Sequence, residues 1–174
     1  EAARRVRAAS PDWDELVRIA RAPGWSGYFS APSEASAERG RTAMEAAAKA
    51  AGGSTDRALT VRLDGRIAYM YILSGRVKEA LELMDRVVAE QRNGALAEPG
   101  SGEWFSAFRA LPLCYLGRLD EAAATLHAAI ERARSSNDPA SLGTMCGIAV
   151  TIAWFRGDAV TAVAHAQEQV RIAE

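Results

Sequence analysis

Apolar residues recur with the spacing of amphipathic helices three times between residue 75 and the end of the sequence. Each recurrence begins at a glycine, and these repeat glycines are Gly75, Gly117 and Gly157, roughly 40 residues apart. Each is followed by an apolar residue two positions on and a small residue five positions on. The following apolar positions fit the i, i+3, i+4, i+7, i+11 template of a helix with one buried face. A recurrence of this length predicts stacked helix pairs, each burying its apolar face against its neighbours.

The second helices of the three predicted pairs share one apolar face. A small residue on this face lets the two helices of a pair approach closely, and the glycine permits the left-handed conformation that ends the first helix. The equivalent positions are Val77, Leu119 and Ala159; Ala80, Ala122 and Ala162; Leu81, Ala123 and Val163; Met84, Leu126 and Ala166; and Val88, Ile130 and Val170.

The pattern divides the chain into a degenerate first part and a regular second part. Residues 1–54 are predicted to form a degenerate helical repeat region. Three regular helix pairs are predicted over 55–92, 103–135 and 139–174, and a Gly- and Pro-containing linker over 93–102 separates the first two. We expect an all-α solenoid of antiparallel helix pairs, about eight or nine helices in all, in which both parts are continuous.

Composition and charge exclude several classes of protein. Hydrophobic residues make up 49% of the 174 positions, enough for a continuous core, and the formal net charge of −1 argues against nucleic-acid binding by this segment. No apolar run approaches the roughly 18 residues of a membrane helix, and the first residues do not resemble a signal peptide. We therefore expect a cytoplasmic chain that does not enter a membrane.

Both ends of the sequence have the character of an internal segment. The first residue is not methionine, and residues 171–174 stop inside a helical pattern. Neither terminal helix carries a polar outer face, so further repeats or a partner are expected to cover the ends, and a homo-oligomer could form through them.

Candidate chemistry is sparse. His127 and His165 have no cysteine, histidine or carboxylate at a spacing typical of a metal site, and Cys114 and Cys146 are interpreted as small buried thiols. We find no motif that would activate a nucleophile, so we predict neither catalysis nor a metal or other cofactor. An enzyme with its active site in the aromatic loop over residues 24–33 remains the less favoured alternative.

The three units resemble tetratricopeptide repeats. In that motif a glycine ends the first helix, a small residue follows five positions later and a large apolar residue follows at nine. The first two units fit, whereas the third has Ala166 where the large residue belongs, and the period exceeds the usual length of about 34 residues. The matching residues are Gly75, Ala80 and Met84; Gly117, Ala122 and Leu126; and Gly157 and Ala162.

Longer alanine- and arginine-rich repeats of this kind resemble the helical region of large bacterial LuxR-type, MalT-like ATP-binding regulators. The stretch over 136–142, before an alanine-rich helix, and the stretch over 155–158 carry the similarity, which extends over about 120 residues. It implies that this segment is a non-catalytic sensor or scaffold arm of a bacterial transcriptional regulator. The alternative is a stand-alone adaptor that binds a protein or peptide partner.

The resemblance also implies a right-handed superhelix whose inner surface is lined by the first helix of each pair. Such a groove would be apolar and aromatic, suited to an amphipathic helix, a peptide or a small apolar ligand. An alternative interpretation is that Leu73, Tyr115 and Trp154 simply pack between repeats. The groove positions are Arg62, Tyr69, Leu73, Trp104, Leu111, Tyr115, Thr144, Thr151 and Trp154.

Overall fold

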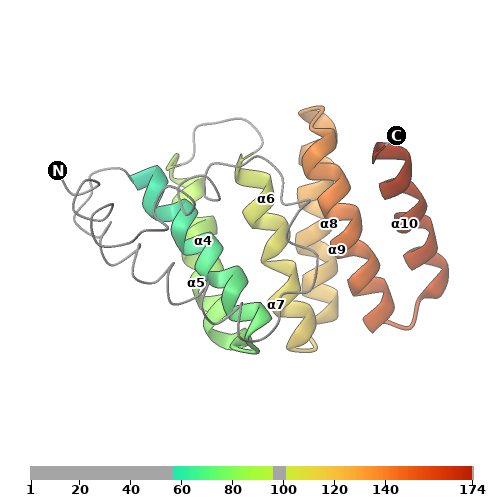
Figure 1. The fold of residues 1–174 in the computed structure, drawn as a ribbon, viewed down its shortest axis with the longest axis horizontal. Coiled ribbons are helices and arrows are strands. Elements are labelled where there is room, and N and C mark those ends of the chain that lie inside the picture. Colours follow the sequence, from blue (N-terminus) through green and yellow to red (C-terminus); the bar gives the residue numbers. More distant parts are fainter. Residues whose placement is uncertain (1–56, 96–100, 174) are drawn as a thin grey trace, which may run out of the picture. The chain divides into compact units, whose positions relative to one another are not determined.

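The computed structural model describes residues 57–95 and 101–173, and every regular element within these two stretches is an α-helix (Figure 1). The chain divides into two compact units, Glu1–Leu96 and Ala97–Glu174. The all-α class predicted from the sequence is therefore confirmed for the described residues. The predictions for residues 1–54, including the loop over 24–33, lie outside them.

The described part of the first unit is one helix pair. Helix α4 spans Arg57–Leu73 and helix α5 spans Val77–Arg92. Arg57, at the start of α4, forms an ion pair with Glu90, near the end of α5, so the two helices run antiparallel. The two helices pack on each other, and the buried side chains of α5 are apolar, namely Ala80, Leu81, Leu83, Met84, Val87 and Val88.

The second unit contains the remaining helices. Helix α9 packs on α8 on one side and on α10 on the other (Figure 1). Phe108, Leu113 and Met145, from three different helices, are completely buried and form the centre of this unit. The helices are α6, Ser101–Phe108; α7, Ala110–Tyr115; α8, Leu119–Ser135; α9, Pro139–Phe155; and α10, Ala159–Ala173.

One predicted helix is divided in two. The sequence pattern predicts a continuous first helix in the second pair, but the structure interrupts it at Arg109, between α6 and α7. Pro112 explains the interruption, because proline has no N–H to donate to the carbonyl of Phe108 and its ring crowds that carbonyl. Arg109 compensates by binding across to α8, where it donates hydrogen bonds of 3.2 Å to both Glu121 and Thr125.

The repeat glycines end the first helix of each pair, as predicted. Their φ angles are +76° at Gly75, +77° at Gly117 and +71° at Gly157. At each one, the next backbone N–H donates to a carbonyl five residues earlier, as between Arg76 and Tyr71 at 2.8 Å, which is the Schellman arrangement. The end of α8 forms the same arrangement with Asn137 at φ +52°.

Replacing Gly117 with alanine is expected to lower the free energy of unfolding by about 1–2 kcal/mol, because an L-residue is strained in the left-handed region. No atom lies within 4 Å of where the new Cβ would stand, so backbone strain alone is tested. Chemical denaturation monitored by circular dichroism measures the change. Gly117→Asn is the matched control and should lose less, since asparagine tolerates this conformation. Equal stability of the alanine variant and the wild type would contradict the prediction.

Small residues set the close approaches between helices. Ala80 and Ala122, five positions after their repeat glycines, have no exposed surface, and Ala162 is nearly as buried. A Cβ added at Gly147 of α9 would lie 3.2 Å from Nε2 of Gln169 on α10, so the glutamine side chain packs over this glycine.

The apolar face shared by the second helices is covered on α8 but not on α10. Ile130 of α8 is 5% exposed, whereas the equivalent Val170 of α10 is 59% exposed. Within the described stretches, no helix is both long enough and hydrophobic enough to cross a lipid bilayer.

Candidate functional site

The groove residues predicted in the first unit all lie on α4, in different environments. Tyr69 is buried and Arg62 is half-buried, whereas Leu73, at the end of the helix, is 36% exposed. Only Leu73 among the three therefore presents a large apolar surface.

Four of the six groove residues predicted in the second unit contribute mainly to the structure of their own helices. Trp104 on α6 and Leu111 on α7 are buried. The ring of Trp104 lies 4.1 Å from that of Phe108, centroid to centroid, and so belongs to the core. Thr144 and Thr151 on α9 are half-buried, and each hydroxyl donates to a carbonyl four residues earlier in the helix, at 3.3 Å.

The other two predicted residues are exposed aromatic side chains near the ends of α7 and α9. Tyr115 ends α7 and is 47% exposed, and Trp154, near the end of α9, is 76% exposed. Phe155, 48% exposed, packs edge-to-face against Tyr115 with ring centroids 5.5 Å apart. We call Tyr115, Trp154 and Phe155 the aromatic cluster. Through Phe155, Tyr115 packs against the next repeat while about half of its surface stays exposed, whereas Trp154 is mostly exposed.

The sequence analysis missed Phe155, although the repeat register contains the signal. Leu73, Tyr115 and Phe155 each stand two residues before a repeat glycine. All three are exposed, so the same position of each of the three sequence repeats presents a large apolar side chain to solvent. The groove prediction included Trp154, which stands one residue before this repeat position. The side chain of Trp154 is more exposed than that of Phe155.

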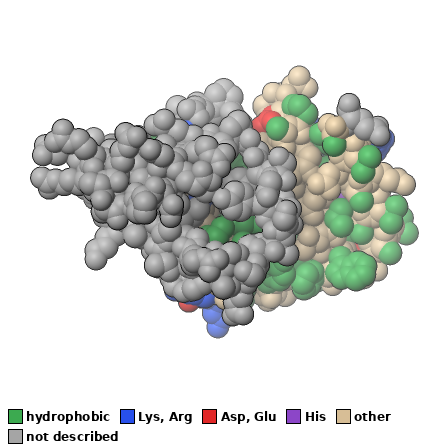
Figure 2. Space-filling view, viewed as in Figure 1, with side chains coloured by type: hydrophobic (Ala, Val, Ile, Leu, Met, Phe, Trp, Pro, Cys, Tyr) green, Lys and Arg blue, Asp and Glu red, His purple; other side chains and the backbone are tan. Residues whose placement is uncertain are grey.

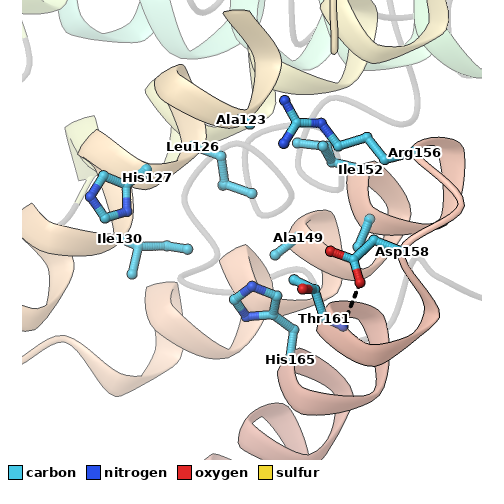
Figure 3. A pocket seen from close by; sticks show the side chains of 11 residues that line it. Ala123, Leu126, His127, Ile130, Ala149, Ile152, Arg156, Asp158, Thr161 and His165 are labelled. Carbon is cyan, nitrogen blue, oxygen red and sulfur yellow. Dashed lines mark hydrogen bonds between the residues drawn. The ribbon is translucent and has the colours of Figure 1, made fainter. Parts of the chain in front are cut away.

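A separate cavity of about 200 Å³ lies between α8, α9 and α10 (Figure 3). Its wall is mostly apolar, with His127 on the α8 side and His165 on the α10 side (Figure 3). The sequence analysis did not predict it, because it forms where the side chains of three helices meet. Its apolar lining includes Leu126 and Ile130 from α8 and Ala149 and Ile152 from α9.

The polar groups at one end of this cavity are held by the turn between α9 and α10. Arg156 forms an ion pair with Asp120 and donates to the carbonyl oxygen of Leu119, which ties the end of α9 to the start of α8. Asp158 accepts a 3.0 Å hydrogen bond from the backbone N–H of Thr161 and so caps α10 (Figure 3). Hydrogen bonds from Thr161 hold the pKa of Asp158 below its usual range. The arrangement offers an apolar ligand a space edged by fixed charges.

Three side chains with metal-binding atoms meet beside this cavity. Cys146 of α9 and His165 and Glu168 of α10 place one donor atom each within 4.8 Å of one another. Arg134 of α8 donates to Oε1 of Glu168 at 2.9 Å, and this bond lowers the pKa of Glu168. The sequence analysis missed the group because Cys146 lies on a different helix from His165 and Glu168. Only the packing of α9 on α10 brings the three side chains together.

Both cysteines are free and buried, as predicted. Burial raises the pKa of the Cys114 thiol. Burial first, and then the neighbouring Glu168 carboxylate, raise the pKa of the Cys146 thiol to about 11. Both groups are therefore protonated thiols at neutral pH.

Hydrophobic side chains are also visible over the part of the surface where α9 and α10 lie (Figure 2). The exposed large hydrophobic residues of α10 are valines, namely Val160, Val163 and Val170. They add apolar surface without the aromatic rings that are enriched at binding hot spots.

Comparison with protein-family models gives no match, and comparison with curated proteins gives no significant match. The resemblance to tetratricopeptide repeats therefore stays a prediction from the sequence, and function must be inferred from the surfaces described above.

Proposed function

We propose that this chain is a non-catalytic, tetratricopeptide-like binding segment whose aromatic cluster holds an apolar segment of a partner protein. The observation that carries the proposal is the exposure of large apolar residues at one repeat position, two residues before each repeat glycine. Exposed apolar and aromatic side chains are a recurring feature of protein-binding sites.

The partner chemistry follows from the cluster. Tyr115 and Phe155 already contact each other, so a binding partner would meet a surface that is partly preorganised. The cluster is predominantly apolar, with the phenolic group of Tyr115 as its polar element. An amphipathic helix or short peptide with one aromatic or aliphatic anchor suits such a surface.

In the fuller form of the proposal, the helix pairs stack as a right-handed solenoid that serves as the sensor or scaffold arm of a bacterial transcriptional regulator. Occupancy would then shift the population between two packings of the array, through differential affinity for them. This part rests on the sequence resemblance. Sequencing the reading frame on both sides tests it: a phosphate-binding loop upstream and a helix-turn-helix downstream support the regulator, whereas nearby stop codons support the stand-alone adaptor.

Replacing Trp154 with alanine is expected to weaken peptide binding at least about 30-fold, since hot-spot truncations cost roughly 2 kcal/mol or more. The unfolding free energy should change by less than about 0.5 kcal/mol, because the side chain is 76% exposed. The probe is a peptide selected on the wild-type chain from a displayed library of amphipathic helices. Fluorescence anisotropy measures its affinity, and chemical denaturation measures stability.

Val160→Ala on α10 is the matched control, because it also truncates an exposed apolar side chain, 82% exposed, outside the aromatic cluster. It should leave peptide affinity unchanged. Failure to select any peptide, or equal affinity for the wild type and the Trp154 variant, would contradict the proposed function.

A further inference from the structure

The group formed by Cys146, His165 and Glu168 is built from two helices that pack directly on each other. His165 and Glu168 stand three residues apart on α10 and so share one face of that helix. Cys146 faces them from α9, where it is completely buried. A sulfur, an imidazole nitrogen and a carboxylate oxygen thus converge within 4.8 Å of one another.

A second observation is that one polar atom of this group has no hydrogen-bond partner. Nδ1 of His165 is buried and has no hydrogen-bond partner. It lies 3.8 Å from Oε2 of Glu168, too far for a hydrogen bond. A buried nitrogen without a partner costs free energy, and a ligand that accepts its lone pair would remove that cost.

The two oxygens of Glu168 have different surroundings. Oε1 accepts a 2.9 Å hydrogen bond from Arg134 of α8, which fixes the orientation of the carboxylate. Oε2 is the oxygen nearer to the imidazole of His165. Arg134 thus orients the carboxylate from outside the group, as outer hydrogen-bond donors orient carboxylates at metal sites, and the Cys146 thiol is the other hydrogen-bond partner of Glu168.

We propose that Cys146, His165 and Glu168 form a binding site for one zinc ion between α9 and α10. Zinc accepts this mixture of sulfur, nitrogen and oxygen ligands, with bond lengths of about 2.0–2.3 Å. Three protein ligands leave the fourth tetrahedral position to water. His165 also lines the cavity between α8, α9 and α10, so the site borders a space that a small ligand could enter.

Binding exchanges a proton for the metal. The Cys146 thiol is protonated before binding, and Zn²⁺ displaces its proton to solvent to form a zinc–thiolate bond. The thiolate and the Glu168 carboxylate together balance the two positive charges of the ion. A bound ion would fasten α10 to α9 and favour the folded state over the unfolded one.

Titration of the full chain with Co²⁺, followed by displacement with Zn²⁺, tests the site. One equivalent of Co²⁺ should produce thiolate-to-cobalt charge-transfer absorption in the near ultraviolet, and one equivalent of Zn²⁺ should abolish it. Cys146→Ser should remove this absorption. His165→Gln changes a half-buried position and should weaken Zn²⁺ binding by at least about 100-fold. Loss of a residue that only orients a metal ligand can weaken binding by up to about 100-fold, and loss of a ligand itself should weaken it at least as much.

The chain supplies matched controls for both changes. Cys114→Ser removes the other buried cysteine, and His127→Gln removes the other histidine of the cavity. Both controls should retain the charge-transfer absorption and the Zn²⁺ affinity of the wild type. Circular dichroism verifies that each variant is folded. If Cys146→Ser does not fold, the Zn²⁺ affinity of His165→Gln decides the test. A folded wild-type chain without the absorption, or a signal that follows Cys114 in place of Cys146, would overturn the proposal.

Discussion

Replacing Phe108 with alanine is expected to lower the free energy of unfolding by about 3–5 kcal/mol, the usual cost of deleting a buried aromatic ring. Phe108 ends α6 and has no exposed surface. Its ring packs against that of Trp104 with centroids 4.1 Å apart, so the deletion would leave a cavity and remove an aromatic contact. Urea denaturation monitored by circular dichroism measures the effect as a lower midpoint at an unchanged slope.

Phe155→Ala provides the control for this result, because it makes the same substitution at a side chain that is 48% exposed. It should cost about 1 kcal/mol or less, mostly through the lost contact with Tyr115. Similar losses for the two variants would mean that Phe108 does not form the core of the second unit, and they would contradict the described packing.

Replacing Ala122 with leucine is expected to destabilise the protein by about 1–3 kcal/mol, because a completely buried position five residues after Gly117 has no room for a larger side chain. The reason is geometric: the small residue lets α8 approach the helix before it. Thermal or urea unfolding measures the loss. Leucine at Ala80, equally buried in the first unit, should have a comparable effect if the two helix pairs are equivalent.

Ala124→Leu is the matched control, since Ala124 lies on the exposed face of the same helix. It should change stability by no more than about 0.5 kcal/mol. If leucine were tolerated equally at Ala122 and Ala124, the small residue of the repeat would have no packing role, and the interpretation of the repeat would lose its physical basis.

Local features of the fold were predictable because they depend on short-range rules. The helical period, the left-handed glycines and the buried small residues follow from steric limits that act within a few residues, and the structure confirms each of them. The break at Arg109 was predictable in principle from Pro112, but the apolar pattern continues through it and hides it.

Surface exposure was harder to predict than helix position. Periodicity identifies the apolar face of a helix, but it does not say which neighbour covers each part of that face. Trp104 and Tyr115 were both assigned to the groove, yet the first is buried in the core and the second is exposed. The group of Cys146, His165 and Glu168 was missed for a similar reason, because it forms only where α9 packs on α10.

The two candidate surfaces of the second unit make different predictions for where a partner binds. The most direct test is a titration of the ¹⁵N-labelled chain with the selected peptide, monitored by amide and indole chemical shifts. Binding at the aromatic cluster predicts that the largest changes occur at Tyr115, Trp154 and Phe155. Changes concentrated instead at His127 and His165, around the cavity between α8 and α10, would contradict the proposed binding surface.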